Sequence, residues 1–171
     1  LAKLLTDHRN KNRKGKPWNE HIVAANLPSY KKLFGMMHGF IDLVFESDGK
    51  YYVCDYKSTH LGDKFSDYNQ QALKENIESQ YYDLQYLIYS LALHRYLKKS
   101  LPDYQASKHF GGAYYLYLRG MTSAPEHVGA GVYHSYIDES ELIALDKLFL
   151  GDDLKSKKNS VLVASKSTPH D

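Results

Sequence analysis

Cysteine is almost absent from this sequence, with Cys54 the single example among 171 residues. One cysteine excludes an intrachain disulfide framework and any zinc or iron–sulfur site built from cysteines of this chain. No apolar run approaches the roughly 20 residues that span a bilayer, and no signal peptide is visible. The phosphate-binding pattern G-x-x-x-x-G-K-S/T is missing, so the chain holds no ATP-driven motor of that kind. Asp-x-Asp and histidine-rich metal patterns are missing too, which disfavours a phosphatase-type metal hydrolase.

The composition that remains is that of an ordinary globular domain, with 43% hydrophobic and 25% charged residues. A chain of this length can bury a sizeable core as one domain. The net charge is only +2, but residues 1–32 hold eight lysines and arginines against two acids. The middle of the chain is acidic, and an acidic site beside a basic arm is typical of a metal-loaded centre that meets a polyanion. A solvated loop with chance lysines is the plainer interpretation for residues 9–16.

The segment from Gly39 to Ser58, GFIDLVFESDGKYYVCDYKS, carries the strongest local signal in the chain. Asp48-Gly49 between two apolar runs predicts a β-hairpin. A two-residue or a four-residue turn there places Asp42 opposite Asp55, and period-two alternation puts Lys57 on the face of Asp55. Directly opposed side chains lie about 4.5–5.5 Å apart, so the two carboxylates need a cation or a shared proton. The pattern predicts a divalent metal site, with an exposed polar sheet face as the alternative.

Two carboxylates and a lysine form a compact set for phosphodiester hydrolysis. Asp42 and Asp55 would hold Mg²⁺, which accepts one or two carboxylates and keeps several waters. Lys57 would stabilise charge on the phosphoryl oxygens. We rank that role above general base, because nearby acids and burial move a lysine pKa in opposite directions. Gln85 and Tyr89 lie one helical turn apart and could bind a phosphate backbone, although packing is the alternative for this weak pattern.

The chain divides into three predicted parts. Residues 1–34 form a basic, loop-like lead-in, residues 35–151 form the core, and residues 152–171 form a loose Lys/Ser-rich tail, whose VLVA run could add an edge strand. The order of elements predicts an α/β fold with a mixed central sheet flanked by helices. After the hairpin we expect a helix that is capped by Ser66 or Asp67, with Asp67 and Gln70 as a capping box, and that ends near Ser79. A second helix is expected over 82–100, with core residues Leu84, Leu87, Ile88 and Leu91. Strands over 112–118 and 131–137 and a helix over 139–150, capped by Asp138, should follow.

Four segments, GFIDLVF, YYVCDYKS, YDLQYLIYSLALHRYL and HFGGAYYLYLRGM, follow one another as they do in a known family. They resemble the nuclease domain of the RecB (beta) subunit of exodeoxyribonuclease V, in the PD-(D/E)xK nuclease superfamily. The likeness runs from about residue 35 to residue 121 and more weakly to residue 151, and it implies a restriction-endonuclease-like core. It also implies metal binding by Asp42, Asp55 and the Tyr56 backbone carbonyl, catalysis by Asp42, Asp55 and Lys57, and DNA binding by Gln85, Tyr89 and Arg119.

The resemblance further implies a Mg²⁺-dependent exodeoxyribonuclease, part of a helicase–nuclease complex that acts in recombinational repair of double-strand breaks. The implied partners are DNA, RecC-like and RecD-like subunits and a RecA-type recombinase, without a membrane, in the cytoplasm of a bacterium. The alternative is a non-catalytic DNA- or protein-docking module that keeps the nuclease fold. Retention of both acids and Lys57 argues against that alternative, because a docking module has no need for so costly an arrangement.

Two metal-site residues of the family lack a counterpart here. The family uses a histidine and a glutamate upstream of these segments, and neither Glu20 nor any of the nine histidines replaces them convincingly. Because the chain begins at Leu1 and not at methionine, we expect an N-terminally truncated nuclease core. We therefore expect weak or absent Mg²⁺ binding and nuclease activity for the isolated chain.

Overall fold

Four strands within the described ranges form one mixed sheet. The structure is a computed structural model, and it describes residues 1–11 and 39–150. The strands are β1 (Leu43–Ser47), β2 (Lys50–Lys57), β3 (Phe110–Tyr117) and β4 (Val132–Ser135), side by side in that order. The outer pairs β1–β2 and β3–β4 are antiparallel, whereas the central strands β2 and β3 are parallel. The mixed sheet expected from the sequence is confirmed, with β3 and β4 displaced by only one or two residues from their expected ends.

The hairpin β1–β2 forms with the expected register. Its ladder runs from Leu43 opposite Cys54 to the turn, where Asp48 and Gly49 have φ angles of 51° and 73°. Two consecutive positive φ angles are what a two-residue type I′ turn requires. Asp42 comes one residue before the ladder begins. Cys54 is buried, and burial raises the pKa of its thiol to about 11, so it serves as a small apolar packing residue.

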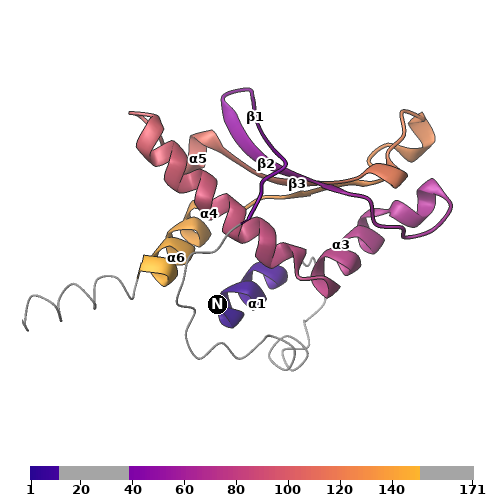
Figure 1. Cartoon of the computed structure of the whole chain (residues 1–171), viewed down its shortest axis with the longest axis horizontal. Helices are drawn as coiled ribbons and strands as arrows, with labels where there is room; N and C mark the ends of the chain where they lie inside the picture. The colour runs from indigo at the N-terminus through magenta and orange to yellow at the C-terminus, as the bar shows by residue number, and fades with distance from the viewer. Residues whose placement is uncertain (12–38, 151–171) are drawn as a thin grey trace, which may run out of the picture.

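Helices cover one face of this sheet. α4 (Tyr82–Ser100) packs against β2 and β3, α3 (Gln70–Ser79) and α6 (Glu139–Leu150) pack against α4, and α1 (Ala2–Lys11) packs against α6. Figure 1 shows α1, α3, α4 and α6 together below the sheet. No helix within the described ranges is long and apolar enough to cross a membrane. Short helices complete the fold, namely η1 (Phe65–Tyr68), α5 (Ala106–His109), η2 (Leu118–Gly120) and η3 (Pro125–His127).

The ends of α4 and α6 agree with the sequence, but part of the expected core stripe on α4 does not. Leu87 and Leu91 are buried, whereas Leu84 and Ile88 are half-buried beside an open groove. The reason is that the side of α4 that packs against the sheet carries Tyr86 rather than Leu84 and Ile88. Tyr86 is 1% exposed. The buried stripe of α4 is therefore rotated by about one residue from the expected stripe.

The N-cap of α3 is Asn69 rather than Ser66 or Asp67. The Asn69 side-chain oxygen accepts a hydrogen bond from the Gln71 amide at 3.0 Å, as an N-cap residue does. The 3₁₀ turn η1 precedes the helix, and within it the Asp67 carboxylate accepts a hydrogen bond from the Lys64 amide at 3.0 Å. The capping box expected from the sequence is therefore wrong, because this extra turn delays the start of α3.

The loop-like structure expected for residues 1–34 is wrong at its beginning, where residues 2–11 form α1. The rest of that stretch, and the tail with its VLVA run, lie outside the described residues. The surface of α1 that meets the domain carries charged and polar groups as well as Leu5, so apolar periodicity alone gives little sign of the helix.

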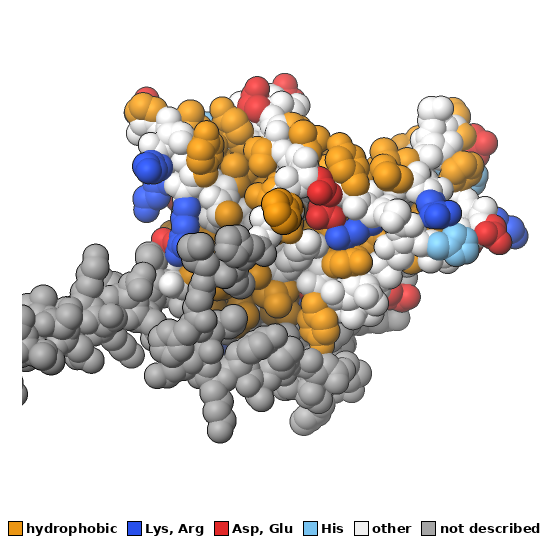
Figure 2. Space-filling view, in the orientation of Figure 1, with side chains coloured by type: hydrophobic (Ala, Val, Ile, Leu, Met, Phe, Trp, Pro, Cys, Tyr) orange, Lys and Arg blue, Asp and Glu red, His pale blue; other side chains and the backbone are white. Residues whose placement is uncertain are grey.

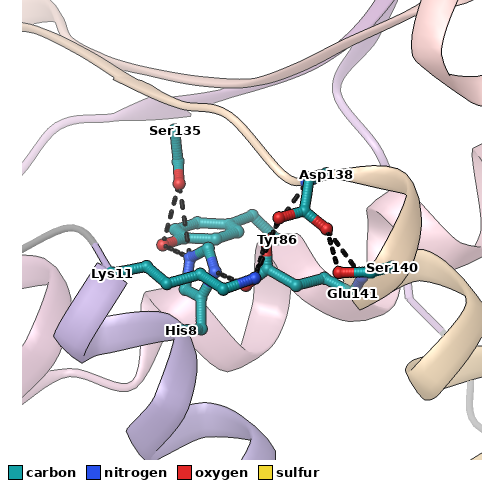
Figure 3. Close-up of polar contacts among 7 residues, drawn as sticks. All are labelled: His8, Lys11, Tyr86, Ser135, Asp138, Ser140 and Glu141. Carbon is teal, nitrogen blue, oxygen red and sulfur yellow. Dashed lines mark hydrogen bonds and ion pairs between the residues drawn. The ribbon is translucent and has the colours of Figure 1, made fainter.

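Polar contacts anchor α1 to the domain (Figure 3). His8 is 1% exposed, with Nδ1 2.8 Å from Glu141 Oε1 and Nε2 2.7 Å from the Tyr86 hydroxyl. Lys11 Nζ lies 2.8 Å from Asp138 Oδ2 at the start of α6. Asp138 is also the expected N-cap, since its Oδ1 accepts a hydrogen bond from the Glu141 amide at 3.0 Å. These contacts join the first and last described helices of the chain.

Candidate active site

Asp55 and Lys57 lie near the end of β2, on the face of the sheet that α4 covers. Asp55 is 6% exposed, and Lys57 Nζ lies 2.6 Å from its Oδ2. The two residues share a face because side chains alternate along a strand. The parallel pairing of β2 with β3 sets Tyr115 directly beside Asp55. Figure 2 shows acidic and basic atoms adjoining near the middle of the visible face, with hydrophobic side chains on both sides.

Helix α4 brings Gln85 to the same lysine. Lys57 Nζ donates to Gln85 Oε1 at 3.2 Å, and the Tyr115 hydroxyl lies 2.8 Å from the same oxygen. Gln85 Nε2 in turn donates to the Tyr89 hydroxyl at 3.0 Å. A lysine ammonium only donates hydrogen bonds, so Lys57 fixes which end of the amide faces it. The expected pair Gln85 and Tyr89 is thus joined to the hairpin residues by a continuous chain of hydrogen bonds.

Two aromatic residues at this site were missed by sequence reasoning. Lys57 Nζ lies 3.8 Å from the centroid of the Tyr82 ring and 4.8 Å from that of the Tyr115 ring. Tyr82 comes three residues before Gln85, a spacing that puts both on one helix face and was a usable signal. Nothing in the sequence pointed to Tyr115, because its place beside Asp55 depends on a parallel pairing between distant segments.

Asp42 approaches the site from the start of β1. Its Oδ2 accepts a hydrogen bond from the Tyr56 amide at 2.9 Å, next to Asp55 in the chain. Burial raises the pKa of Asp55 above its ordinary value, and the charge of Asp42 adds to this effect, while the bond and charge of Lys57 oppose it. On balance, the surroundings of Asp55 therefore favour its protonated form.

The donor set fits a hard divalent cation such as Mg²⁺. One oxygen of each acid already has a partner in the protein. Asp42 Oδ2 accepts a hydrogen bond from the Tyr56 amide, and Asp55 Oδ2 pairs with the Lys57 ammonium. A metal would be held by the carboxylates of Asp42 and Asp55, which lie close enough for the charge of Asp42 to raise the pKa of Asp55. No group of three or more His, Cys, Asp or Glu side chains suited to a metal occurs in that part of the chain. Mg²⁺ tolerates such a site because it is commonly held by one or two carboxylates and keeps several waters.

Arg119 and Tyr56 are less directly connected to this cluster. Arg119, on η2, is exposed, and its Nε donates to the Ser58 carbonyl at 2.9 Å, one residue beyond Lys57. The side chain of Tyr56 is 44% exposed and alternates onto the sheet face opposite that of Asp55. The predicted roles of the Arg119 side chain and the Tyr56 carbonyl stay predictions.

A groove of about 450 Å³ opens beside the cluster. Gln85 and Tyr89 belong to its lining, which ties it to the hydrogen-bonded chain at Lys57. Gly39 stands against the Tyr89 ring, where an added Cβ atom would come within 2.9 Å of Cε1 and the ring would have to shift. The other lining residues are largely apolar, namely Ile41, Tyr81, Leu84, Ile88 and Ala92.

Comparison with known proteins agrees with this geometry. The model of the PD-(D/E)XK nuclease superfamily matches residues 2–158. The chain belongs to the PD-(D/E)XK nuclease superfamily. Asp42 immediately before β1, Asp55 on β2 and Lys57 two residues after Asp55 have the order of a D…D-x-K pattern. The restriction-endonuclease-like fold expected from the sequence is confirmed.

Curated relatives of this chain include RecB subunits. The chain is 44% identical to "RecBCD enzyme subunit RecB" of Haemophilus influenzae over 131 residues, which are 77% of this chain and 10% of the relative. It is 44% identical to the Escherichia coli protein of the same name over 135 residues, 78% of this chain and 11% of that protein. The Mycobacterium tuberculosis counterpart is 37% identical over 132 residues, 77% of this chain and 12% of that protein. The chain thus spans about a tenth of the length of these relatives, and the expected resemblance to the RecB nuclease domain is confirmed.

Proposed function

We propose that this superfamily member hydrolyses phosphodiester bonds of DNA with Mg²⁺, as an exodeoxyribonuclease. The observation that carries the proposal is the meeting of Asp55, Lys57 and Gln85 on one face of the sheet, with Asp42 hydrogen-bonded beside them. A docking module would present its charges at the surface, whereas Asp55 and Lys57 are 6% and 12% exposed. Burial of charge is costly unless the groups are paired and hydrogen-bonded, as these two are.

Each side chain has a role that its contacts support. Asp42 and Asp55 would hold Mg²⁺, which when bound lowers the pKa of a coordinated water and neutralises charge on the phosphoryl oxygens. Lys57 places a positive charge beside Asp55, where it would stabilise the charge that develops on the scissile phosphate. Its ammonium already donates towards Asp55 and Gln85, which supports electrostatic stabilisation over action as a general base. Because the Tyr89 hydroxyl accepts a bond from Gln85, its own proton is left to donate to a DNA phosphate.

The proposed setting follows from the relatives. Their name makes them subunits of a RecBCD enzyme, and we propose that this chain acts within a longer RecB-like protein, with RecC-like and RecD-like partners, in recombinational repair. A RecA-type recombinase as a further partner, and the bacterial cytoplasm as the location, belong to the same proposal. The isolated chain should bind Mg²⁺ weakly, because its described part brings only two acids together.

The test is degradation of linear DNA with Mg²⁺ by the protein that carries this chain. Asp55→Ala and Lys57→Ala should each abolish cleavage while leaving DNA binding in place. The turn of the same hairpin offers matched controls, because Asp48 and Lys50 repeat the Asp-x-Lys pattern at exposed positions. Asp48→Asn and Lys50→Ala should therefore cleave like the parent. If Asp55→Ala and Lys57→Ala degrade DNA at the parental rate, the catalytic proposal fails.

A further inference from the structure

The Lys57 ammonium is enclosed by four groups. Asp55 Oδ2 lies 2.6 Å away and Gln85 Oε1 lies 3.2 Å away. The rings of Tyr82 and Tyr115 stand at 3.8 Å and 4.8 Å from centroid to Nζ, within the range of a cation–π interaction. The lysine side chain is only 12% exposed, although four flexible bonds link its ammonium to the backbone. Its position therefore depends on these neighbours and is not set by the strand alone.

The rings of Tyr82 and Tyr115 form an aromatic wall beside Lys57. They are stacked on each other, with centroids 5.8 Å apart and an angle of 29° between their planes. Tyr115 is 1% exposed, lies on β3 beside Asp55, and packs edge-on against Tyr86 of α4. Tyr82 is the first residue of α4, directly after Tyr81, whose φ of 55° turns the chain into the helix. The wall is thus built from a strand and a helix that meet only in the folded domain.

We propose that Tyr82 and Tyr115 are positioning residues for the nuclease reaction, holding the Lys57 ammonium beside Asp55 by cation–π contact. The inference rests on the proposed function, since it assigns residues that act through Lys57. Tyr82 contributes its ring face. Tyr115 contributes its ring and also a hydroxyl 2.8 Å from Gln85 Oε1, which keeps that oxygen turned towards the lysine. Without the wall, Lys57 would sample positions in which its charge no longer meets the phosphate.

Tyr82 is the residue to change, because it is half-buried at a helix end whereas Tyr115 is a core residue. In the protein that carries this chain, Tyr82→Leu should lower kcat by about 3- to 30-fold, the range that a cation–π contact supplies. KM for DNA should stay at the parental value, and loss of the ring stacked on Tyr115 should lower the melting temperature only slightly. Tyr82→Phe, which keeps the ring face, should restore most of the rate. Tyr96→Leu is the matched control, because Tyr96 lies on the same helix at 65% exposure.

A graded series separates ring electrostatics from ring shape. Phenylalanine at position 82 carrying one, two or three fluorine atoms should lower kcat stepwise, because fluorine withdraws charge from the ring face while nearly preserving its size. Equal rates across the series, or a Tyr82→Leu variant with parental kcat, would overturn the positioning role. If either of these results is obtained while Lys57→Ala is inactive, the positioning role fails but the nuclease proposal stands. A parental rate in Lys57→Ala would instead mean that the nuclease proposal itself had failed.

Discussion

Arg9 and Asp83 form a buried ion pair whose loss should destabilise the domain strongly. Arg9 Nε bonds Asp83 Oδ2, and Nη2 lies 2.9 Å from Asp83 Oδ1 and 3.0 Å from the Glu78 carbonyl. The two side chains are 3% and 2% exposed. In Arg9→Met the apolar chain would fill most of the space, but the Asp83 carboxylate would stay buried without its cation. Removing one partner of a buried pair costs about 3–5 kcal/mol.

Urea unfolding of the chain, followed by circular dichroism at neutral pH, measures this loss of free energy. Lys11→Met is the control on the same helix, since Lys11 and its nearer partner Asp138 are 49% and 38% exposed, and its second partner Glu141 is 3.6 Å away. An exposed pair contributes about 0–1 kcal/mol. The double variant Arg9→Met with Asp83→Leu should regain most of the stability, because no unpaired charge is then left inside.

The outcome that refutes this reasoning is specific. If Arg9→Met costs less than about 1 kcal/mol, as expected of Lys11→Met, the pair does not anchor α1 to α4. If the double variant is no more stable than Arg9→Met, the loss arises from other contacts of Arg9 and not from an uncompensated charge. Both comparisons require that the free energy of unfolding fall with urea concentration at the same slope in every variant.

Two further predictions concern acids whose pKa values are shifted in the folded state. Burial opposes ionisation of Glu141, but the hydrogen bond and charge of His8 hold the pKa of Glu141 below its ordinary value. The ionised Glu141 therefore stabilises the fold fully above the unfolded pKa. This stabilisation is lost as pH falls through the lower folded pKa. Glu141→Gln should therefore be less stable than the parent at neutral pH, with the gap closing below about pH 4 in urea titrations; a gap that is constant with pH contradicts this. Burial raises the pKa of Asp55, so its ionised form lowers stability as pH rises through the folded value. Without metal, the free energy of unfolding of the parent should therefore fall as pH rises through the folded pKa of Asp55, and Asp55→Asn should lack this fall. A parent whose stability shows no such fall contradicts the prediction.

Local rules determined the hairpin and the two longest helices. The turn Asp48-Gly49 and the period-two alternation were enough to give the register of β1 and β2 and to place Asp55 and Lys57 on one face. Helical periodicity with clear stop signals located α4 and α6. Their rotation was less well determined, as the half-buried Leu84 shows, because a helix with apolar residues on several sides can turn more than one of them inward.

Contacts between distant segments were decided only by the tertiary structure. His8 and Arg9 meet partners 133 and 74 residues away, so α1 docks through pairs that no local pattern contains. The same holds at the site. The sequence by itself determined two acids, a lysine and a Gln–Tyr pair on a helix, since these follow from the chain's own periodicities. Only the packing of α4 and β3 against β2 decided that Gln85, Tyr82 and Tyr115 surround Lys57, because a lysine's position is set by whatever the fold brings to its ammonium.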